Sequence, residues 1–273
     1  MRAAEENIRA GRLGDALEQL QQQVRTDPGK AELRVFLFQL LCVSAQWQRA
    51  LTQLQVLHEL DASALPMVTA YAEAVRCETV REEVFAGKRS PLIFGDPKPW
   101  IAQLVEALRQ DAEGQHAEAS RLRGQALEEA GTSSGSIDGH EFEWIADADP
   151  RLGPVLEAIV NGHYYWIPFQ RIRRIRLEAP DDLRDLVWMP AQFTWANEGE
   201  AVALIPSRYP GVTSGDDPQL LLSRRTEWTS PFSDFYVGHG QRLLVTDQDE
   251  YPLLEAREVE LANREPGTET DVG

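Results

Sequence analysis

A repeat with a period of about 34 residues in the first half of the chain constrains the fold more than any other feature. Residues 11–28 place apolar side chains at the i, i+3, i+4 and i+7 positions of one amphipathic helix. The same stripe returns one period later, where Ala45 takes the place of Gly11, and a third copy of the signal starts at Gly114. This period is typical of tetratricopeptide repeats. We therefore predict tetratricopeptide-like helical hairpins over residues 1–130.

The third copy of the repeat is displaced along the chain. Gly114 lies close to two periods beyond Ala45, so a degraded unit is expected between them. Within that interval, residues 88–99 (KRSPLIFGDPKP) hold three prolines and a glycine, which predicts a loop that interrupts the array. Stacked hairpins present a concave surface, and such surfaces usually hold peptides or helices.

A small, polar run at residues 131–139 predicts a linker to a second domain. Beyond it, a helix is expected from Asp149 to Val160, a short helix start at residues 179–182, and a hairpin bend at Gly238-His239-Gly240. Short strands are expected at 163–169, 171–177, 187–195, 200–205, 220–228, 242–246 and 253–259. The predicted fold class is therefore multidomain α and α+β, with a small, curled antiparallel sheet in an α+β domain over residues 140–262 and a flexible tail over 263–273.

Composition limits the classes of partner. The formal charge of −17 argues against nucleic acid and against an anionic membrane surface, because both require positive potential on the protein. The N-terminal stretch lacks the apolar core of a signal peptide, and no apolar run reaches the length of a membrane span, so a cytoplasmic protein without membrane insertion is expected. Cys42 and Cys77 both lie in apolar helical patterns and are expected to be buried thiols.

The sequence offers no chemical motif. The five histidines show no metal-ligand spacing, and no nucleophile elbow or nucleotide fingerprint is present. We therefore expect no catalytic residue, no cofactor and no metal.

The stretch from His163 to Pro190 combines aromatic and basic residues and is the best candidate for a binding surface. Arginine and aromatic side chains are common anchors of protein interfaces. The candidates are Tyr164, Tyr165, Trp166, Trp188, Arg171, Arg173 and Arg174. In the other interpretation the arginines pair internally with the nearby acids Glu178, Asp181, Asp182 and Asp185.

Three long strings of the second half resemble a known family. They are ADADPRLGPVLEAIVNGHYYWIPFQRIRRI, EAPDDLRDLVWMPAQFT and EAVALIPSRYPG, and the later segments TEWTS, GQRLL and DEYPLLEAR agree with them. The chain resembles the ImpE family, also called the SciE-type (TagJ) family, over nearly its whole length.

The resemblance implies a non-enzymatic accessory protein of a bacterial type VI secretion system. It implies binding to the small sheath subunit TssB through the N-terminal helix of that subunit, and a link to the ATPase ClpV, which disassembles the sheath. The helix could dock in the helical half or on the second domain around Trp166 and Trp188. Two alternatives remain: a co-chaperone-like repeat protein for another client, and a hydrolase-like enzyme in the second domain, which would require His163 and His239 to converge with acids.

Overall fold

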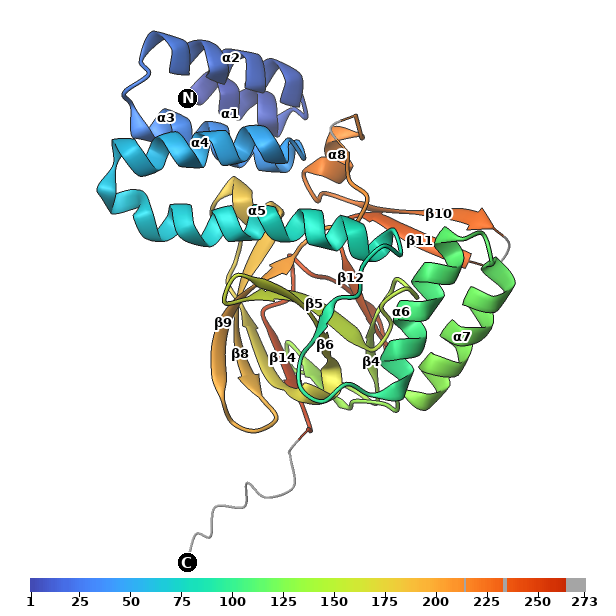
Figure 1. The fold of residues 1–273 in the computed structure, drawn as a ribbon. Helices are drawn as coiled ribbons and strands as arrows, with labels where there is room; N and C mark the ends of the chain where they lie inside the picture. Colours follow the sequence, from blue (N-terminus) through green and yellow to red (C-terminus); the bar gives the residue numbers. More distant parts are fainter. Residues whose placement is uncertain (214, 233–234, 264–273) are drawn as a thin grey trace, which may run out of the picture.

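The computed structural model describes residues 1–213, 215–232 and 235–263 and confirms a helical first half followed by a sheet-rich domain (Figure 1). Of the predicted tail, 264–273 lie outside the described residues. The helices of the first half are α1 (Arg2–Arg9), α2 (Leu13–Thr26), α3 (Ala31–Val43), α4 (Trp47–Leu60), α5 (Leu65–Phe85), α6 (Pro99–Ala112) and α7 (His116–Glu129). Within the described residues, no helix is long and apolar enough to cross a membrane.

The predicted helical hairpins are confirmed, and three of them share the same turn. Helices α2, α4 and α7 each contain 14 residues, and α4 begins one period after α2, at Trp47 against Leu13. The turn before each of them has one residue in the left-handed region: Gly11 (φ 76°), Ala45 (φ 52°) and Gly114 (φ 78°). Each turn is closed by a backbone hydrogen bond like that from the Arg12 N–H to the Asn7 carbonyl, at 2.8 Å. This is the Schellman closure of a helix end, which requires positive φ.

The degraded unit is a single long helix followed by an extended segment. Helix α5 has 21 residues in place of a hairpin. The loop predicted at residues 88–99 contains a short strand, β1 (Leu92–Ile93), that pairs in parallel with β6 (His163–Pro168). The interruption in the array therefore also adds an edge strand to the sheet of the second half.

The strands of the second half are arranged in sheets of three kinds among the residues that the structure describes. The described residues form a nine-stranded sheet in the order β1-β6-β5-β9-β8-β7-β14-β2-β3, a three-stranded sheet β13-β12-β4 and a ribbon β10-β11. Every pairing among them is antiparallel except that of β1 with β6. The strands are β2 (Gly135–Ile137), β3 (His140–Phe142), β4 (Ile145–Asp147), β5 (Val155–Val160), β7 (Ile172–Leu177), β8 (Trp188–Trp195), β9 (Glu200–Pro206), β10 (Thr226–Phe232), β11 (Phe235–Gly240), β12 (Leu243–Thr246), β13 (Glu250–Pro252) and β14 (Glu258–Leu261).

Several local predictions for this half are wrong. The helix expected from Asp149 to Val160 is strand β5, whose residues are all buried. A strand buried on both faces is apolar along its whole length, and such a run also satisfies the helical spacing. The Gly238-His239-Gly240 segment continues β11 instead of forming a bend. The strand expected from residue 220 begins as a short helix, α8 (Pro218–Leu221), and residues 135–137 of the expected linker form β2.

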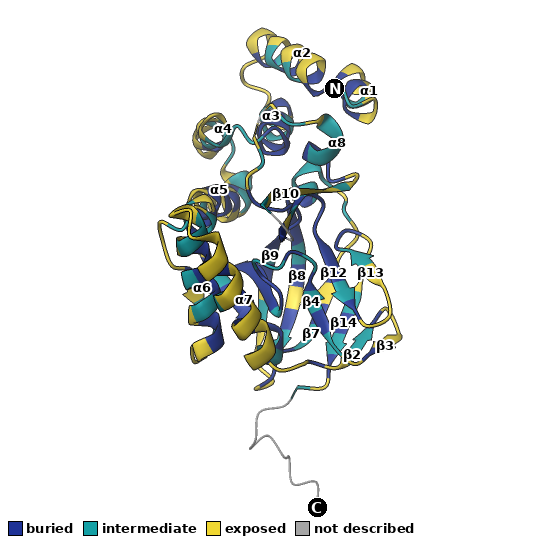
Figure 2. Ribbon diagram, turned by 90° about the vertical axis from the view of Figure 1, so that its right-hand side faces the viewer, coloured by how far each residue is buried: buried dark blue, intermediate teal, exposed yellow. Residues whose placement is uncertain are grey.

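The helices and the sheet share one apolar core. Alternate residues of β6 point in opposite directions: Tyr164 and Trp166 join the cluster formed by the helices, whereas Ile167 joins a second cluster among the sheets. Phe85 at the end of α5 packs on Trp166, with ring centroids 6.0 Å apart. Figure 2 shows that α2 and α7 expose their outer faces while the strands beneath the helical layer are buried. The helical half therefore covers one face of the large sheet.

A buried ionic network joins α5 to the sheet. The Arg81 guanidinium donates to both oxygens of Glu157 on β5, at 2.7 and 3.0 Å. Arg242 also donates to Glu157 and, at 2.5 Å, to Asp147. Arg208 donates to the Val43 carbonyl at the end of α3 at 2.7 Å, where the helix dipole favours a cation. All of these side chains are buried. The ion pairs of Arg81 and Arg242, and the carbonyl bonds of Arg208, offset the cost of removing the charges from water.

Candidate partner-binding groove

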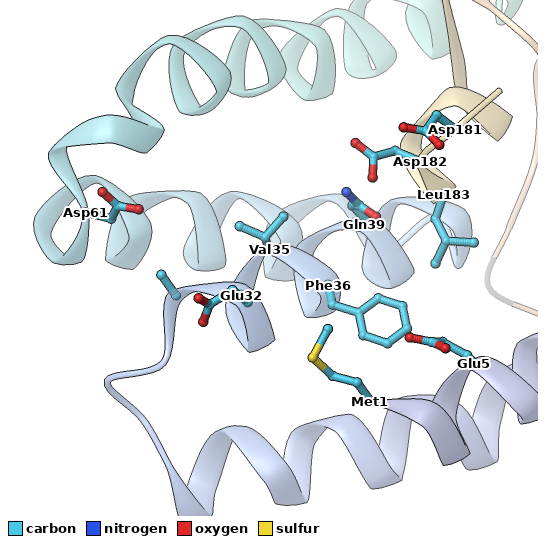
Figure 3. A pocket seen from close by; sticks show the side chains of 11 residues that line it. Met1, Glu5, Glu32, Val35, Phe36, Gln39, Asp61, Asp181, Asp182 and Leu183 are labelled. Carbon is cyan, nitrogen blue, oxygen red and sulfur yellow. The ribbon is translucent and has the colours of Figure 1, made fainter. Parts of the chain in front are cut away.

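A groove of about 460 Å³ lies between the N-terminal helices and the segment that precedes β8 (Figure 3). It adjoins a second hollow of about 340 Å³ that shares five of its lining residues. The residues common to both are Glu5, Phe36, Asp181, Asp182 and Leu183. The two hollows therefore form one continuous surface, which we call the α1–α3 groove.

Helix α3 supplies the floor of the α1–α3 groove. The lining residues Glu32, Val35, Phe36 and Gln39 occupy positions i, i+3, i+4 and i+7, which share one face of a helix. Most other residues of α3, such as Leu37 and Leu40, are buried in the core, while Arg34 is partly exposed. The face from Glu32 to Gln39 is the one that lines the groove.

The wall opposite α3 is held rigidly by a capped helical turn. The backbone N–H groups of Asp181 and Asp182 donate to the Asp185 carboxylate at 3.0 and 2.8 Å, and Asp182 caps the 3₁₀ turn Leu183–Leu186 in return. Arg184 pairs with Asp182 and stacks on Tyr71 of α5, 4.7 Å from the ring centroid. The helix start expected at residues 179–182 is confirmed as this short turn, and it fixes the position of two acids at the groove.

Acidic side chains surround the apolar floor, as Figure 3 shows. Glu32 and Asp61 lie toward one end, and Glu5, Asp181 and Asp182 lie toward the other. Hydrogen bonds from Ser63 lower the pKa of Asp61, so this group is ionised at neutral pH. The groove is therefore a negatively charged, partly apolar surface.

The aromatic residues proposed as anchors are mostly not on the surface. Trp166 and Trp188 are fully buried and Tyr164 is 3% exposed, while Tyr165 is half-buried against Phe94. The Trp188 indole donates to Glu78 at 2.8 Å, and the Trp166 indole donates to the Tyr164 hydroxyl at 2.8 Å. Because the helical layer covers this face of the sheet, Trp166 and Trp188 stabilise the contact between the two halves and are closed to a partner in this structure.

The arginines proposed as steering charges lie in and beside β7, away from the α1–α3 groove. Arg174 and Arg176 pair with Glu260 and Glu258, which stand directly opposite them on β14. Arg173 pairs with Glu198, and Arg171 with Asp96 at 3.7 Å. Internal pairing is therefore confirmed, but the expected partners Glu178, Asp181, Asp182 and Asp185 are wrong. The ladder register brings together acids distant in sequence, and the steering role of Arg171, Arg173 and Arg174 stays a prediction.

The residues of the groove floor were missed by the sequence reasoning, which concentrated on the aromatic stretch of the second half. A signal was present: Val35 and Phe36 stand outside the stripe that α3 buries in its hairpin. An apolar pair on the open face of a helix in a repeat array indicates a surface that is covered by something else.

The histidines give no support to the enzyme alternative. His163 contacts the Asn161 carbonyl at 2.9 Å, and His239 contacts the Thr229 hydroxyl at 2.8 Å, in two different sheets. Neither contact is to an acid. Within the described part of the chain, no group of three or more His, Cys, Asp or Glu side chains could hold a metal ion.

Three comparisons place the chain among known proteins. The model of the ImpE protein family matches residues 139–260. A curated relative, the type VI secretion system accessory component TagJ of Pseudomonas aeruginosa, is 53% identical over 257 residues, which cover 94% of this chain and 90% of the relative. The crystal structure of protein VPA1032 from Vibrio parahaemolyticus is similar in fold, with a TM-score of 0.87, 22% identity, and coverage of 96% of this chain and 98% of that one.

Proposed function

Because this chain belongs to the ImpE family, we propose that it is an accessory component of a bacterial type VI secretion system. In this proposal it acts in the cytoplasm as a non-enzymatic adaptor. It binds the N-terminal helix of the small sheath subunit TssB and links the sheath to the ATPase ClpV. The designation of the P. aeruginosa relative as an accessory component supports an adaptor role.

The α1–α3 groove is the observation that carries the proposal. An amphipathic helix binds proteins by laying its apolar stripe into a groove of this kind. Val35, Phe36 and Leu183 belong to the apolar part of the lining, together with Met1 and Ala31. Phe36 is only half-buried in the free chain. A partner helix that covers Phe36 would complete its burial and so gain free energy from the hydrophobic effect.

The test is calorimetric titration of this protein with the purified small sheath subunit, with and without that subunit's first helix. We expect binding only to the full-length subunit. Phe36→Ala should raise the Kd about tenfold or more, as expected for a central interface anchor. Val202→Ala is the matched control, because Val202 is 71% exposed on β9, outside the groove.

Two results would contradict the proposal. One is equal affinity for the truncated subunit; the other is an unchanged Kd for a Phe36→Ala variant whose circular dichroism shows native helix content. The link to the ATPase is tested separately, by asking whether ClpV binds the adaptor–sheath complex more tightly than the sheath subunit alone.

A further inference from the structure

The charge around the α1–α3 groove restricts its ligand. Across the two adjoining hollows, the lining side chains include five carboxylates and one guanidinium, that of Arg9. Glu5, Glu32 and Asp181 form no ion pair with any residue that the structure describes. A helix that covers the floor also removes water from these carboxylates. An acidic or neutral ligand would leave them without compensation, whereas a ligand with cations along its edges would pair with them.

Gln39 provides a second, independent observation. Its side chain lines the groove and is only 6% exposed. Among the described residues its amide has no hydrogen-bond partner, and Figure 3 shows it between Val35 and the acids of the opposite wall. A polar group in this position loses its water when the groove is covered, so a bound ligand must supply a hydrogen bond or the complex is weakened.

The shape of the floor limits the length of the ligand. The open face of α3 runs from Glu32 to Gln39, about two helical turns, which corresponds to about 10 Å at the helical rise. The acids stand toward both ends of this face. The apolar stripe of a ligand is therefore short, about two helical turns, and is bounded by charge on both sides.

From these observations we propose that the groove binds a basic amphipathic helix. Its apolar stripe of about two turns rests on Val35 and Phe36. Lysine or arginine side chains at both ends of the stripe pair with Glu5, Glu32 and Asp181, and one polar side chain bonds to the Gln39 amide. This inference rests on the proposed function and deepens it, because it specifies the chemistry of the segment that the adaptor recognises.

Two helical peptides test the inference without the natural partner. Both carry the same two-turn leucine stripe and one central glutamine. One peptide has lysine at both ends of the stripe, and the other has glutamate there. We expect the lysine peptide to bind, the glutamate peptide to bind at least tenfold more weakly, and the affinity of the lysine peptide to fall as salt is raised. The triple variant Glu5→Gln, Glu32→Gln, Asp181→Asn should raise the Kd of the lysine peptide about tenfold. Glu128→Gln on the exposed face of α7 is the matched control.

The Kd of each variant for the small sheath subunit is then measured. This measurement separates the proposed adaptor function from the inference of a basic helical ligand. Equal binding of both peptides, or an unchanged Kd in a folded triple variant, overturns the inference even if the sheath subunit binds. Tight binding of the lysine peptide, lost in Val35→Lys, supports the inference even if the sheath subunit fails to bind and the proposed function falls. Gln39→Leu should weaken the binding of the peptide with the central glutamine more than the binding of a peptide with leucine at that position. Equal losses of affinity for the two peptides would overturn the role of the amide.

Discussion

The Arg81 guanidinium on α5 and the Glu157 carboxylate on β5 form a bidentate, buried ion pair that connects the helical layer to the sheet. The two hydrogen bonds measure 2.7 and 3.0 Å, and Glu157 has no exposed surface. Glu157 also accepts from Arg242 and from the Tyr164 hydroxyl. Two buried cations thus share this one carboxylate, and each also pairs with a second acid, Arg81 with Glu78 and Arg242 with Asp147. Glu157 stands on the helix-facing side of β5 between Val155 and Ile159.

Removal of the Glu157 charge should destabilise the whole chain. In Glu157→Gln, Arg81 and Arg242 lose their shared anion while they remain buried, which typically costs ~3–5 kcal/mol. Urea denaturation followed by far-ultraviolet circular dichroism measures this loss. Glu198→Gln is the control, because Glu198 pairs with Arg173 at the surface and should change the free energy of unfolding by less than ~1 kcal/mol. Equal stabilities of the two variants would show that the buried pair contributes little.

Acid should weaken the fold through the same carboxylate. Burial by itself raises the pKa of Glu157, but the charges of Arg81 and Arg242 outweigh it and lower the pKa to about 2. Between about pH 4.5 and pH 2 the unfolded chain therefore binds a proton at this position that the folded chain does not. The stabilisation is complete above about pH 4.5 and is lost as the pH falls toward 2. The slope of unfolding free energy against pH in this window should be shallower in Glu157→Gln, and parallel slopes would refute the assignment.

Trp188 should matter for stability and not for partner binding. Trp188→Phe leaves the buried Glu78 carboxylate without the indole donor at 2.8 Å, a loss of ~1–3 kcal/mol. The Kd for the small sheath subunit should not change in the folded protein, because Trp188 is fully buried. Trp228→Phe is the control, since Trp228 is 38% exposed and should change stability by less than ~0.5 kcal/mol. If Trp188→Phe raised the Kd for the sheath subunit and Trp228→Phe did not, Trp188 would act as an interface anchor, as the sequence predicts.

Glycine should be favoured at the second repeat turn. Ala45 has φ of 52°, in the region that glycine occupies in the two equivalent turns, so Ala45→Gly relieves backbone strain. We expect a gain of ~0.5–1 kcal/mol, because the extra freedom of glycine in the unfolded chain offsets part of the relief. Gly114→Ala should cost a similar amount, and thermal unfolding of both variants measures the pair. A loss of stability in Ala45→Gly would mean that the Ala45 side chain contributes more by packing than its backbone costs.

The sequence by itself determined the helical half, the order of the two halves and five of the strands. The repeat period was readable because each hairpin follows one local rule: an apolar stripe, a left-handed turn and a small residue at the crossing. Strands β6 to β9 and β12 were predicted close to their observed bounds, since aromatic and β-branched runs ending at turns are local signals as well.

Tertiary structure alone decided which faces are covered. The aromatic residues Trp166 and Trp188 had the composition of an interface, and they do form one, but with the chain's own helices. The partners of Arg174 and Arg176 came from β14, far away in the sequence, because ladder register and not sequence proximity sets cross-strand pairs. The α1–α3 groove joins residues near position 36 to residues near position 182. No local pattern encodes such a meeting, because it depends on how the helical layer docks on the sheet, which is determined by the sum of many distant contacts.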